Sequence, residues 1–280
     1  MDNELKEMMG NDKSDTECPL NNQDNHCDMP SMSARELCDK SLPSREHIMF
    51  PWLLKPGLAM LYGHRGLGKS FLALFIAITV AIAGRLFKWA APVPRVVLYI
   101  DGEMPLADIQ GRLKSICDSL NCQPPETLLF LNDEILKGQM PNLSTAAGRA
   151  KIKKLLLNHN VSLMIVDNVS TLCGSKQNFA SSWRPIQDWA LTLRKLGISI
   201  LFIHHSNKAG LQRGTGERED ILDVIIRLER PQNYQPTDGA RFQIHYDKSR
   251  GFWGDDAKPF EATLITSEGK HEWKTAEISE

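Results

Sequence analysis

The sequence predicts an α/β fold, in which a mostly parallel central sheet is flanked by helices and ends in C-terminal antiparallel strands. From residue 58 to residue 203, short apolar runs of strand length alternate with longer segments of helical periodicity. Such alternation is typical of a parallel sheet with helices on both faces. The chain has 280 residues, of which 42% are hydrophobic, enough for one substantial core. After residue 206 the apolar runs are separated by Pro, Gly and Asn, which predicts antiparallel strands.

The expected elements follow one another along the chain. Residues 51–57 form a turn that leads into a first strand at 58–62, and an apolar helix follows at 71–83. The remaining strands are expected at 96–100, 128–131, 163–166, 198–203, 221–228, 241–246 and 260–266, and the remaining helices at 106–120, 145–158 and 183–196.

Residues 1–44 differ in composition from the rest of the chain. They carry ten acidic and four basic side chains, a net charge of −6, whereas the whole chain has a net charge of −1. Because this segment is polar and lacks periodic apolar positions, it is expected to be a disordered tail or a short adaptor segment. Residues 45–280 are expected to form one domain with a net charge of +5, which permits binding to a polyanion without requiring it.

The first residues are polar and acidic, with no cationic start or secretory apolar segment, and no run of about 18 apolar residues follows. These features predict a cytoplasmic protein whose six cysteines are reduced. Cys18, Cys27 and Cys38 lie close to His26, but their spacing favours a flexible tail over a metal site.

The segment from Gly63 to Ser70 has the phosphate-loop pattern of two glycines followed by lysine and a hydroxyl residue, and it stands between an expected strand and an expected helix. Glycine lets the backbone curl so that its N–H groups point at phosphate oxygens, and the start of the helix adds positive charge. A turn with no ligand is the alternative. The expected nucleotide-binding residues are Gly63, His64, Arg65, Gly66, Leu67, Gly68, Lys69, Ser70 and Phe71.

Specific side chains of this loop and of a later strand are expected to complete an ATP and Mg²⁺ site. Lys69 is placed to reach the β and γ phosphates, and Ser70 to hold the magnesium ion. Asp167 ends an apolar strand and is expected to join Ser70 at the metal, because ligands of a parallel sheet bind at the carboxyl ends of its strands.

Glu103 follows the strand 96–100 and fits the task of orienting water against the γ phosphate. Asp101 is the competing candidate, and a carboxylate that only starts the next helix is the structural alternative. His204 and His205 end another strand, where one of them is expected to contact the γ phosphate or the attacking water. Zinc binding by the histidines is not expected, because no Glu or Cys stands at ligand spacing.

In these motifs the chain resembles the RecA-like P-loop ATPases, in particular the AAA-type subgroup that contains the hexameric plasmid replicative helicases of the RepA type. The resemblance extends from about Pro51 to about Phe260. It is carried by the segments Trp52–Gly57, Gly63–Ser70, Tyr99–Glu103, Leu163–Asp167, Phe202–Ser206 and Asp247–Gly251.

The resemblance implies roles for residues of this chain. Glu103 corresponds to the catalytic base, His205 to the sensor, and Lys248 and Arg250 to a basic finger that enters the neighbouring subunit's site. It also implies a ring, with a hexamer as the expected form. The loops 168–182 and 206–220 correspond to nucleic-acid-binding loops, in which Lys176, Lys208 and Arg213 are expected to contact a phosphate backbone, although merely solvated loops are an equal alternative.

The function expected from the resemblance is Mg²⁺-dependent ATP hydrolysis coupled to translocation on, or unwinding of, single-stranded DNA in replication of a mobile element such as a plasmid. The acidic tail is then available to a loading or adaptor protein. Two other functions stay open: an ATP-switched regulatory or assembly protein, and an ATPase that assists DNA repair or recombination without unwinding.

Overall fold

The computed structural model describes residues 30–173, 179–206, 220–267 and 269–278. The chain divides into two compact units, Met1–Pro43 and Ser44–Glu280. The described part of the first unit contains one short helix, α1 (Ala34–Asp39), which the sequence pattern did not predict. Ser33 caps this helix by accepting a hydrogen bond from the backbone of Glu36, whose carboxylate accepts one from the Ser33 backbone in return.

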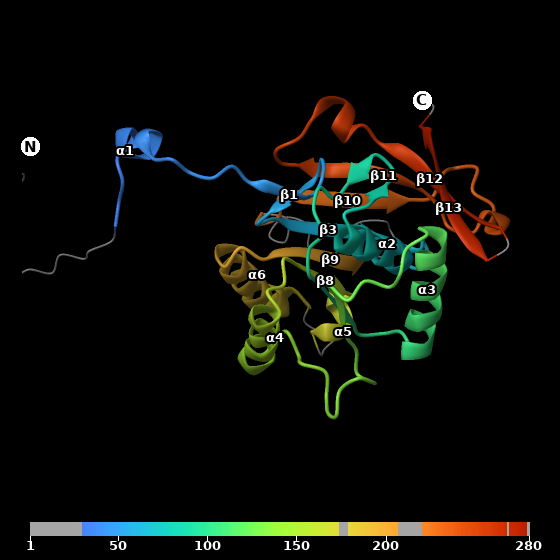
Figure 1. Cartoon of the computed structure of the whole chain (residues 1–280), viewed down its shortest axis with the longest axis horizontal. Coiled ribbons are helices and arrows are strands. Elements are labelled where there is room, and N and C mark those ends of the chain that lie inside the picture. The colour runs from blue at the N-terminus through green and yellow to red at the C-terminus, as the bar shows by residue number, and fades with distance from the viewer. Residues whose placement is uncertain (1–29, 174–178, 207–219, 268, 279–280) are drawn as a thin grey trace, which may run out of the picture. The chain divides into compact units, whose positions relative to one another are not determined.

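The second unit is built on a nine-stranded sheet with the strand order β13-β12-β11-β10-β3-β9-β8-β6-β7 (Figure 1). The six strands from β10 to β7 run parallel, and β11, β12 and β13 continue the sheet in antiparallel fashion. The bounds are β3 (Leu58–Gly63), β6 (Val97–Asp101), β7 (Leu128–Leu131), β8 (Leu163–Asp167), β9 (Ser199–His205), β10 (Val224–Glu229), β11 (Arg241–Ser249), β12 (Phe260–Ser267) and β13 (Lys270–Glu277). The predicted α/β class, with its antiparallel C-terminal strands, is therefore confirmed.

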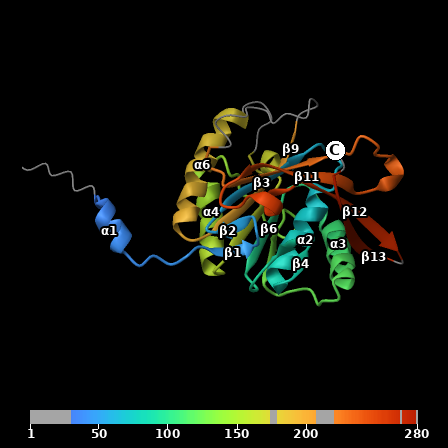
Figure 2. The same ribbon diagram turned by 90° about the horizontal axis from the view of Figure 1, so that it is seen from above.

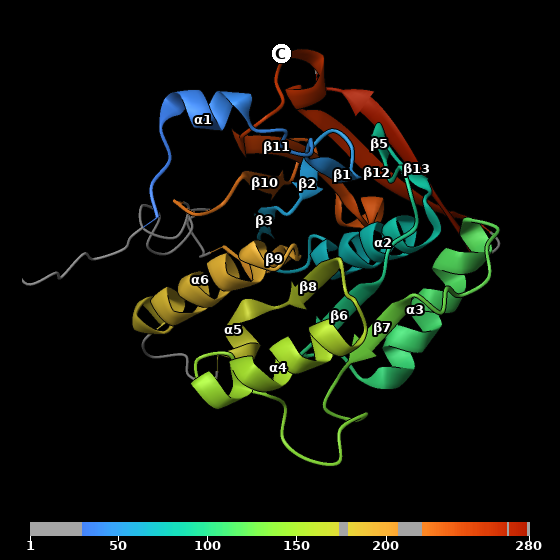
Figure 3. The same ribbon diagram turned by 60° about the vertical axis from the view of Figure 1, so that its left-hand side comes forward.

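Helices cover both faces of the parallel strands (Figure 3). Helices α2 and α3 pack on one face, and α4, α5 and α6 pack on the other. Figure 2 shows the same arrangement from above. The bounds are α2 (Lys69–Ile82), α3 (Leu106–Ser119), α4 (Ala146–Asn158), α5 (Val169–Leu172) and α6 (Phe179–Lys195).

Each central strand contributes side chains to two separate cores, because successive side chains point to opposite faces of the sheet. In β3, Ala59 and Leu61 pack under α2, whereas Leu58, Met60 and Tyr62 pack under α6 and α4. This double burial explains why the strands are nearly continuous apolar runs in the sequence. Residues 72–81 of α2 are all buried as well, which is why that helix is apolar on every side.

The structure corrects the sequence prediction in several places. The strand at 221–228 was expected among the antiparallel strands, but the observed strand β10 is parallel to β3 and pairs with it directly. Strand β13 and two small hairpins were not predicted. The hairpins pair β1 (Glu46–Met49) with β2 (Leu53–Lys55), and β4 (Arg85–Leu86) with β5 (Trp89–Ala90). Helix α5 and the first turn of α6 lie within the segment 168–182, which was expected to be a loop.

Within the residues that the structure describes, no helix combines the length and the apolar character needed to cross a lipid bilayer.

Candidate functional site

The phosphate-loop segment joins β3 to α2, as the sequence predicted. Gly66 and Gly68 have φ values of 76° and 86°, a backbone conformation that side chains with a Cβ rarely adopt. Gly63 is required for another reason, because a Cβ there would lie 2.6 Å from the carbonyl oxygen of Leu228 in β10. The glycines of the motif therefore shape the loop through both backbone conformation and close packing.

The side chains of the loop divide into two groups. His64 and Arg65 are exposed, whereas Leu67 is buried in the core and Phe71 packs edge-to-face on Phe75. The side chain of Leu67 thus anchors the loop, and the side chain of Phe71 anchors the first turn of α2.

Lys69 is buried at the first position of α2. Its ammonium group donates hydrogen bonds to the carbonyl oxygens of Gly63 (2.9 Å) and His64 (2.6 Å). Burial lowers the pKa of Lys69 to about 8, with Asp167 opposing the shift. A buried cation held by neutral carbonyls is a strong attractor for an anion such as a phosphate.

Asp167 ends β8 and is buried beside the phosphate loop. Its carboxylate accepts a hydrogen bond from the hydroxyl of Tyr99 at 2.6 Å. Burial raises the pKa of Asp167 to about 6, and hydrogen bonds from Tyr99 and Ser70 oppose that rise. The predicted pair of Ser70 and Asp167 is thus in contact. Tyr99 is a further member of the site, and its place in a buried apolar strand gave no separate signal.

Asp101 and Glu103 occupy different environments. One carboxylate oxygen of Asp101 accepts the backbone N–H groups of Glu103 (2.8 Å) and Met104 (2.7 Å), so Asp101 fixes the turn after β6. Burial raises the pKa of Asp101. The side chain of Glu103 is 49% exposed and is free of that structural task. Glu103 does not cap α3, because the residue at the N-cap position is Pro105.

The two histidines at the end of β9 also differ. His204 is buried, whereas Nε2 of His205 lies 3.8 Å from the Glu103 carboxylate and 3.1 Å from the side-chain nitrogen of Asn168. Burial lowers the pKa of His205, and Lys69 and Arg65 lower it further while Glu103 opposes them. His205 is therefore the histidine that shares a site with Glu103. Asn168 had no signal of its own in the sequence.

These groups meet because the parallel strands end at one edge. Gly63 is in register with His205 across β3 and β9, and Asp101 is in register with Asp167 across β6 and β8. We call this set the carboxyl-edge cluster. Its members are Gly63, Lys69, Ser70, Tyr99, Glu103, Asp167, Asn168 and His205.

Lys248 and Arg250 lie near the amino ends of the parallel strands, away from the carboxyl-edge cluster. The end of β11 pairs with the start of β10, and Val224 there is level with Ala59 in β3. Ala59 and Gly63 are four residues apart along a strand, which corresponds to roughly 13 Å. Arg250 also pairs with the buried Asp223 at 3.4 Å. The structure therefore does not bring these two residues to the phosphate loop of their own chain.

The remaining predicted residues, Lys176, Lys208 and Arg213, lie outside the described residues. The same holds for Cys18, His26 and Cys27 of the acidic segment.

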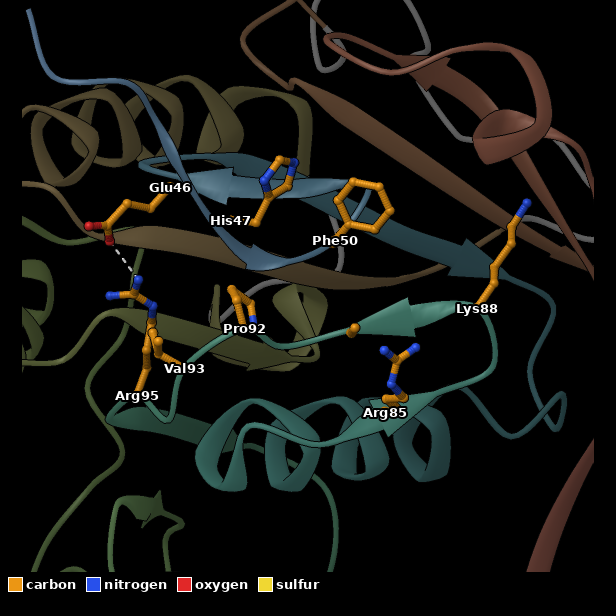
Figure 4. A pocket seen from close by; sticks show the side chains of 9 residues that line it. Glu46, His47, Phe50, Arg85, Lys88, Pro92, Val93 and Arg95 are labelled. Atoms are coloured by element: carbon orange, nitrogen blue, oxygen red, sulfur yellow. Dashed lines mark hydrogen bonds and ion pairs between the residues drawn. The ribbon is translucent and has the colours of Figure 1, made fainter.

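A separate cavity of about 680 Å³ lies between the hairpin β1–β2 and the segment that contains β4 and β5 (Figure 4). Its lining comes from residues 46–50 and 85–95. Arg95 pairs with Glu46 at 2.5 Å, and the ammonium group of Lys88 donates to backbone oxygens of the β11–β12 connection. No lining residue belongs to the carboxyl-edge cluster, so this cavity is not assigned to the nucleotide.

Three of the matches to known proteins are informative for this site. A family model described as "AAA domain" matches residues 24–210. The DNA repair protein RadA of Campylobacter jejuni is 28% identical over 182 residues, which cover 63% of this chain and 34% of RadA. The chain thus spans about a third of the length of this curated relative. A KaiC-like protein of the archaeon Pyrococcus horikoshii superimposes with a TM-score of 0.54 at 10% identity, covering 79% of this chain and 90% of that chain. The structural likeness shows the fold alone.

Proposed function

The chain belongs to the AAA domain family and is a RecA-like P-loop ATPase, and from this premise we propose that the carboxyl-edge cluster binds ATP with Mg²⁺ and hydrolyses it. The observation that carries the proposal is the meeting of Lys69, Asp167 and Glu103 at one edge of the sheet. The loop and Lys69 hold the β and γ phosphates in this proposal, because Lys69 is a buried cation beside backbone N–H groups at a helix start.

The residues beside the loop fit a magnesium ion. Mg²⁺ prefers oxygen ligands and takes few of them from protein, and the contact between the Ser70 hydroxyl and the Asp167 carboxylate offers two such groups. When bound, the ion neutralises charge that develops on the phosphates. The hydroxyl of Tyr99 holds the Asp167 carboxylate in place, as an outer-shell partner does in other metal sites.

Glu103 is the proposed general base. Its carboxylate is partly exposed and unengaged in the turn, so it can orient a water molecule and accept its proton. His205, 3.8 Å away, is the proposed sensor. Because His205 also lies beside Asn168, where α5 begins, it links the γ-phosphate position to the segment that follows β8.

Arg250 and Lys248 are proposed to act on the site of a neighbouring subunit. Their place near the far edge of the sheet excludes a contact with the nucleotide of the same chain, and it supports a ring or filament in which each site is shared. A guanidinium can neutralise charge on the γ phosphate in the transition state. A hexameric ring is the form we propose.

The work coupled to hydrolysis is proposed to be movement on, or unwinding of, single-stranded DNA in replication of a mobile element such as a plasmid. Lys176, Lys208 and Arg213 are the proposed DNA contacts, and the acidic segment 1–44 the proposed site for a loading or adaptor protein in the cytoplasm. Support comes from the net charge of +5 outside that segment.

A second candidate is an ATPase that assists DNA repair or recombination without unwinding. The observation that favours it is the similarity to a protein named for DNA repair.

The test is the ATPase rate with and without single-stranded DNA, measured at two salt concentrations together with the mass of the assembly in ATP. Translocation predicts a higher rate with DNA, a salt-sensitive affinity and a ring-sized mass. Unwinding of a forked duplex separates the helicase from the repair accessory, which binds the same DNA and leaves the duplex intact. An ATPase rate that is the same with and without DNA, with no salt-dependent DNA binding, would refute both the helicase and the repair accessory. An ATP-switched regulatory protein would then remain.

A further inference from the structure

The cavity beside the hairpin β1–β2 is a slot between two antiparallel backbone segments (Figure 4). At one end of the slot the backbones of Phe50 and Ala90 exchange hydrogen bonds of 2.7 and 3.0 Å. At the other end the ion pair between Arg95 and Glu46 joins the two segments. Glu46 and Phe50 are four residues apart, so the slot is up to roughly 13 Å long.

The sequence explains why the two segments separate between these ends. In this stretch, all of which the structure describes, no backbone hydrogen bond joins residues 46–49 to residues 91–95. Pro92 and Pro94 have no N–H group, so the pairing that starts at Ala90 lacks the donors to continue. The gap that results has a volume of about 680 Å³, which is within the range of small-molecule sites.

The fold holds both walls of the slot in place. On one wall β1 pairs with β2, and Ile48 is fully buried in the core. On the other wall the N–H group of Ala91 donates to the carbonyl oxygen of Gly84 at 3.0 Å. The N–H group of Arg95 donates to the carbonyl oxygen of Val80 in α2 at 3.2 Å. A cavity that is ordered before its ligand arrives loses less entropy on binding.

Much of the lining of the slot is apolar and open to solvent. The side chains of Phe50 and Val93 are each 44% exposed, and Pro92 is exposed beside Val93. The ring of His47 packs edge-to-face on Phe50, with 5.2 Å between the ring centroids. Exposed apolar side chains that line a hollow are suited to the apolar body of a ligand.

Three cationic side chains line the slot, and two of them are already engaged. Arg95 is paired with Glu46, and the ammonium group of Lys88 donates to backbone carbonyl oxygens outside the slot. Arg85 is exposed and has no hydrogen-bond or ion-pair partner among the residues that the structure describes. It lies directly across the β4–β5 hairpin from Ala90. One guanidinium is therefore available to an anion.

From this geometry we propose that the slot binds a small organic monoanion of the aromatic carboxylate class. The carboxylate pairs with Arg85, and the apolar body of the ligand lies against Phe50 and Val93. One available guanidinium compensates one negative charge, and the further charges of a nucleoside triphosphate would lie uncompensated against an apolar lining. An inserted peptide strand is disfavoured as well, because Pro92 and Pro94 cannot donate hydrogen bonds to it. The proposal does not depend on ATP binding at the carboxyl-edge cluster.

The test titrates the full chain with two fluorescent probes. Anilinonaphthalene sulfonate has apolar rings and one negative charge, and phenylnaphthylamine has the same rings without the charge. Wild type is expected to bind both probes saturably, and naphthoate, which carries a carboxylate on the naphthalene ring, is expected to displace them. Arg85→Gln is expected to weaken the binding of the sulfonate about three- to tenfold and to leave that of phenylnaphthylamine unchanged. Val93→Asp is expected to weaken the binding of both probes, because it places a carboxylate in the apolar wall.

Arg35→Gln is the matched control, because it removes an exposed arginine that does not line the slot. Thermal unfolding of each variant checks that the fold is intact. The proposal is wrong if wild type does not bind the sulfonate saturably, if naphthoate does not displace it, or if Arg85→Gln weakens both probes equally or neither. Displacement of the sulfonate by excess ATP would place the probe at the phosphate loop and would also overturn the proposal, without bearing on ATP hydrolysis.

Discussion

The two carboxylates proposed to act in hydrolysis differ in what surrounds them. Asp167 is buried, bonded by Tyr99 and Ser70, and its pKa is raised to about 6 by burial. Glu103 is half-exposed and has its backbone N–H, but not its side chain, engaged by Asp101. A buried, hydrogen-bonded carboxylate suits a metal ligand, and a half-exposed one that water can reach suits a base that must accept a proton.

Glu103→Gln is expected to keep ATP affinity and to lower kcat by about 10²- to 10⁴-fold, because the amide retains the shape of the side chain but cannot accept the proton. Nucleotide affinity and single-turnover hydrolysis of the purified variant measure the two effects separately. Asp101→Ala is the comparison: it removes the oxygen that accepts the N–H groups of Glu103 and Met104 and so disturbs the turn that positions Glu103, and a loss of stability is expected there. Normal turnover in Glu103→Gln would show that the base is another group.

The pH dependence of hydrolysis is expected to depend on His205. Burial, Lys69 and Arg65 lower its pKa below 6.5 and Glu103 opposes them, so the imidazole is neutral at pH 7 and gains its proton only at more acidic pH. Once protonated, it faces the Glu103 carboxylate at 3.8 Å and competes for it as an ion pair. The ATPase rate is therefore expected to fall as the pH drops below about 6.5.

The substituted side chain in His205→Gln is neutral at every pH. The variant is therefore expected to lose less of its ATPase rate at acidic pH than wild type. The measurement is kcat from pH 5 to pH 9 for both proteins. Superimposable profiles would mean that titration of His205 does not control the rate.

At the scale of elements, the phosphate loop depends on how closely β3 approaches β10. A Cβ at Gly63 would meet the carbonyl oxygen of Leu228 at 2.6 Å, and a backbone atom in a central strand has little freedom to move away. The loop that follows ends at Gly68, the N-cap residue of α2, which has a left-handed conformation. The strand, the loop and the helix are thus coupled through glycine positions as well as through the hydrogen bonds that the Lys69 side chain donates to Gly63 and His64.

Gly63→Ala is expected to lower the free energy of unfolding by about 1–3 kcal/mol and to weaken nucleotide binding, since the added methyl group must push β10 or the loop aside. The control is Gly111→Ala in α3, where a Cβ would have no neighbour within 4 Å. Because alanine is the better helix residue, that change is expected to raise stability by about 0.5–1 kcal/mol. Urea unfolding measures both, and equal effects in the two variants would contradict the packing argument.

At the scale of the whole molecule, the direction of the strands separates the two groups of residues proposed to act in hydrolysis. The proposed nucleotide site lies at the carboxyl ends of the parallel strands, and the antiparallel strand β11 leads back to Arg250 near their amino ends. One chain therefore presents a phosphate loop near one edge of the sheet and a guanidinium near the other. Such a chain is suited to a head-to-tail assembly.

Mixing Arg250→Ala chains with Glu103→Gln chains is expected to restore part of the activity that each lacks alone. At some mixed interfaces an intact Glu103 meets an intact Arg250, on the order of a quarter of the interfaces if the chains mix at random in equal amounts. The measurement is the ATPase rate of co-assembled protein against each variant alone. No rescue in assemblies shown by mass to contain both chains would argue that Arg250 does not act in a neighbour's site.

Much of the fold could be predicted because its signals are local. The buried strands 58–62 and 163–166 are continuous apolar runs, and the glycines, lysine and serine of residues 63–70 lie together in sequence. The direction of β10 was predicted wrongly, because pairing with β3 joins residues more than 160 positions apart. Strand β13 is mostly polar, with only Trp273 and Ala276 as apolar residues, and lacks the apolar run by which the other strands were recognised.

The sequence by itself determined that this chain has a phosphate loop, a carboxylate at the end of a later strand and an α/β alternation, since each feature depends on residues that are close together in the sequence. Only the tertiary structure decided that Asp101 holds a turn while Glu103 stays open, that His205 rather than His204 faces Glu103, and that Arg250 lies away from its own phosphate loop. The tertiary structure alone also brings Arg95 beside Glu46. These relations depend on strand order and register, which are set by packing between distant segments.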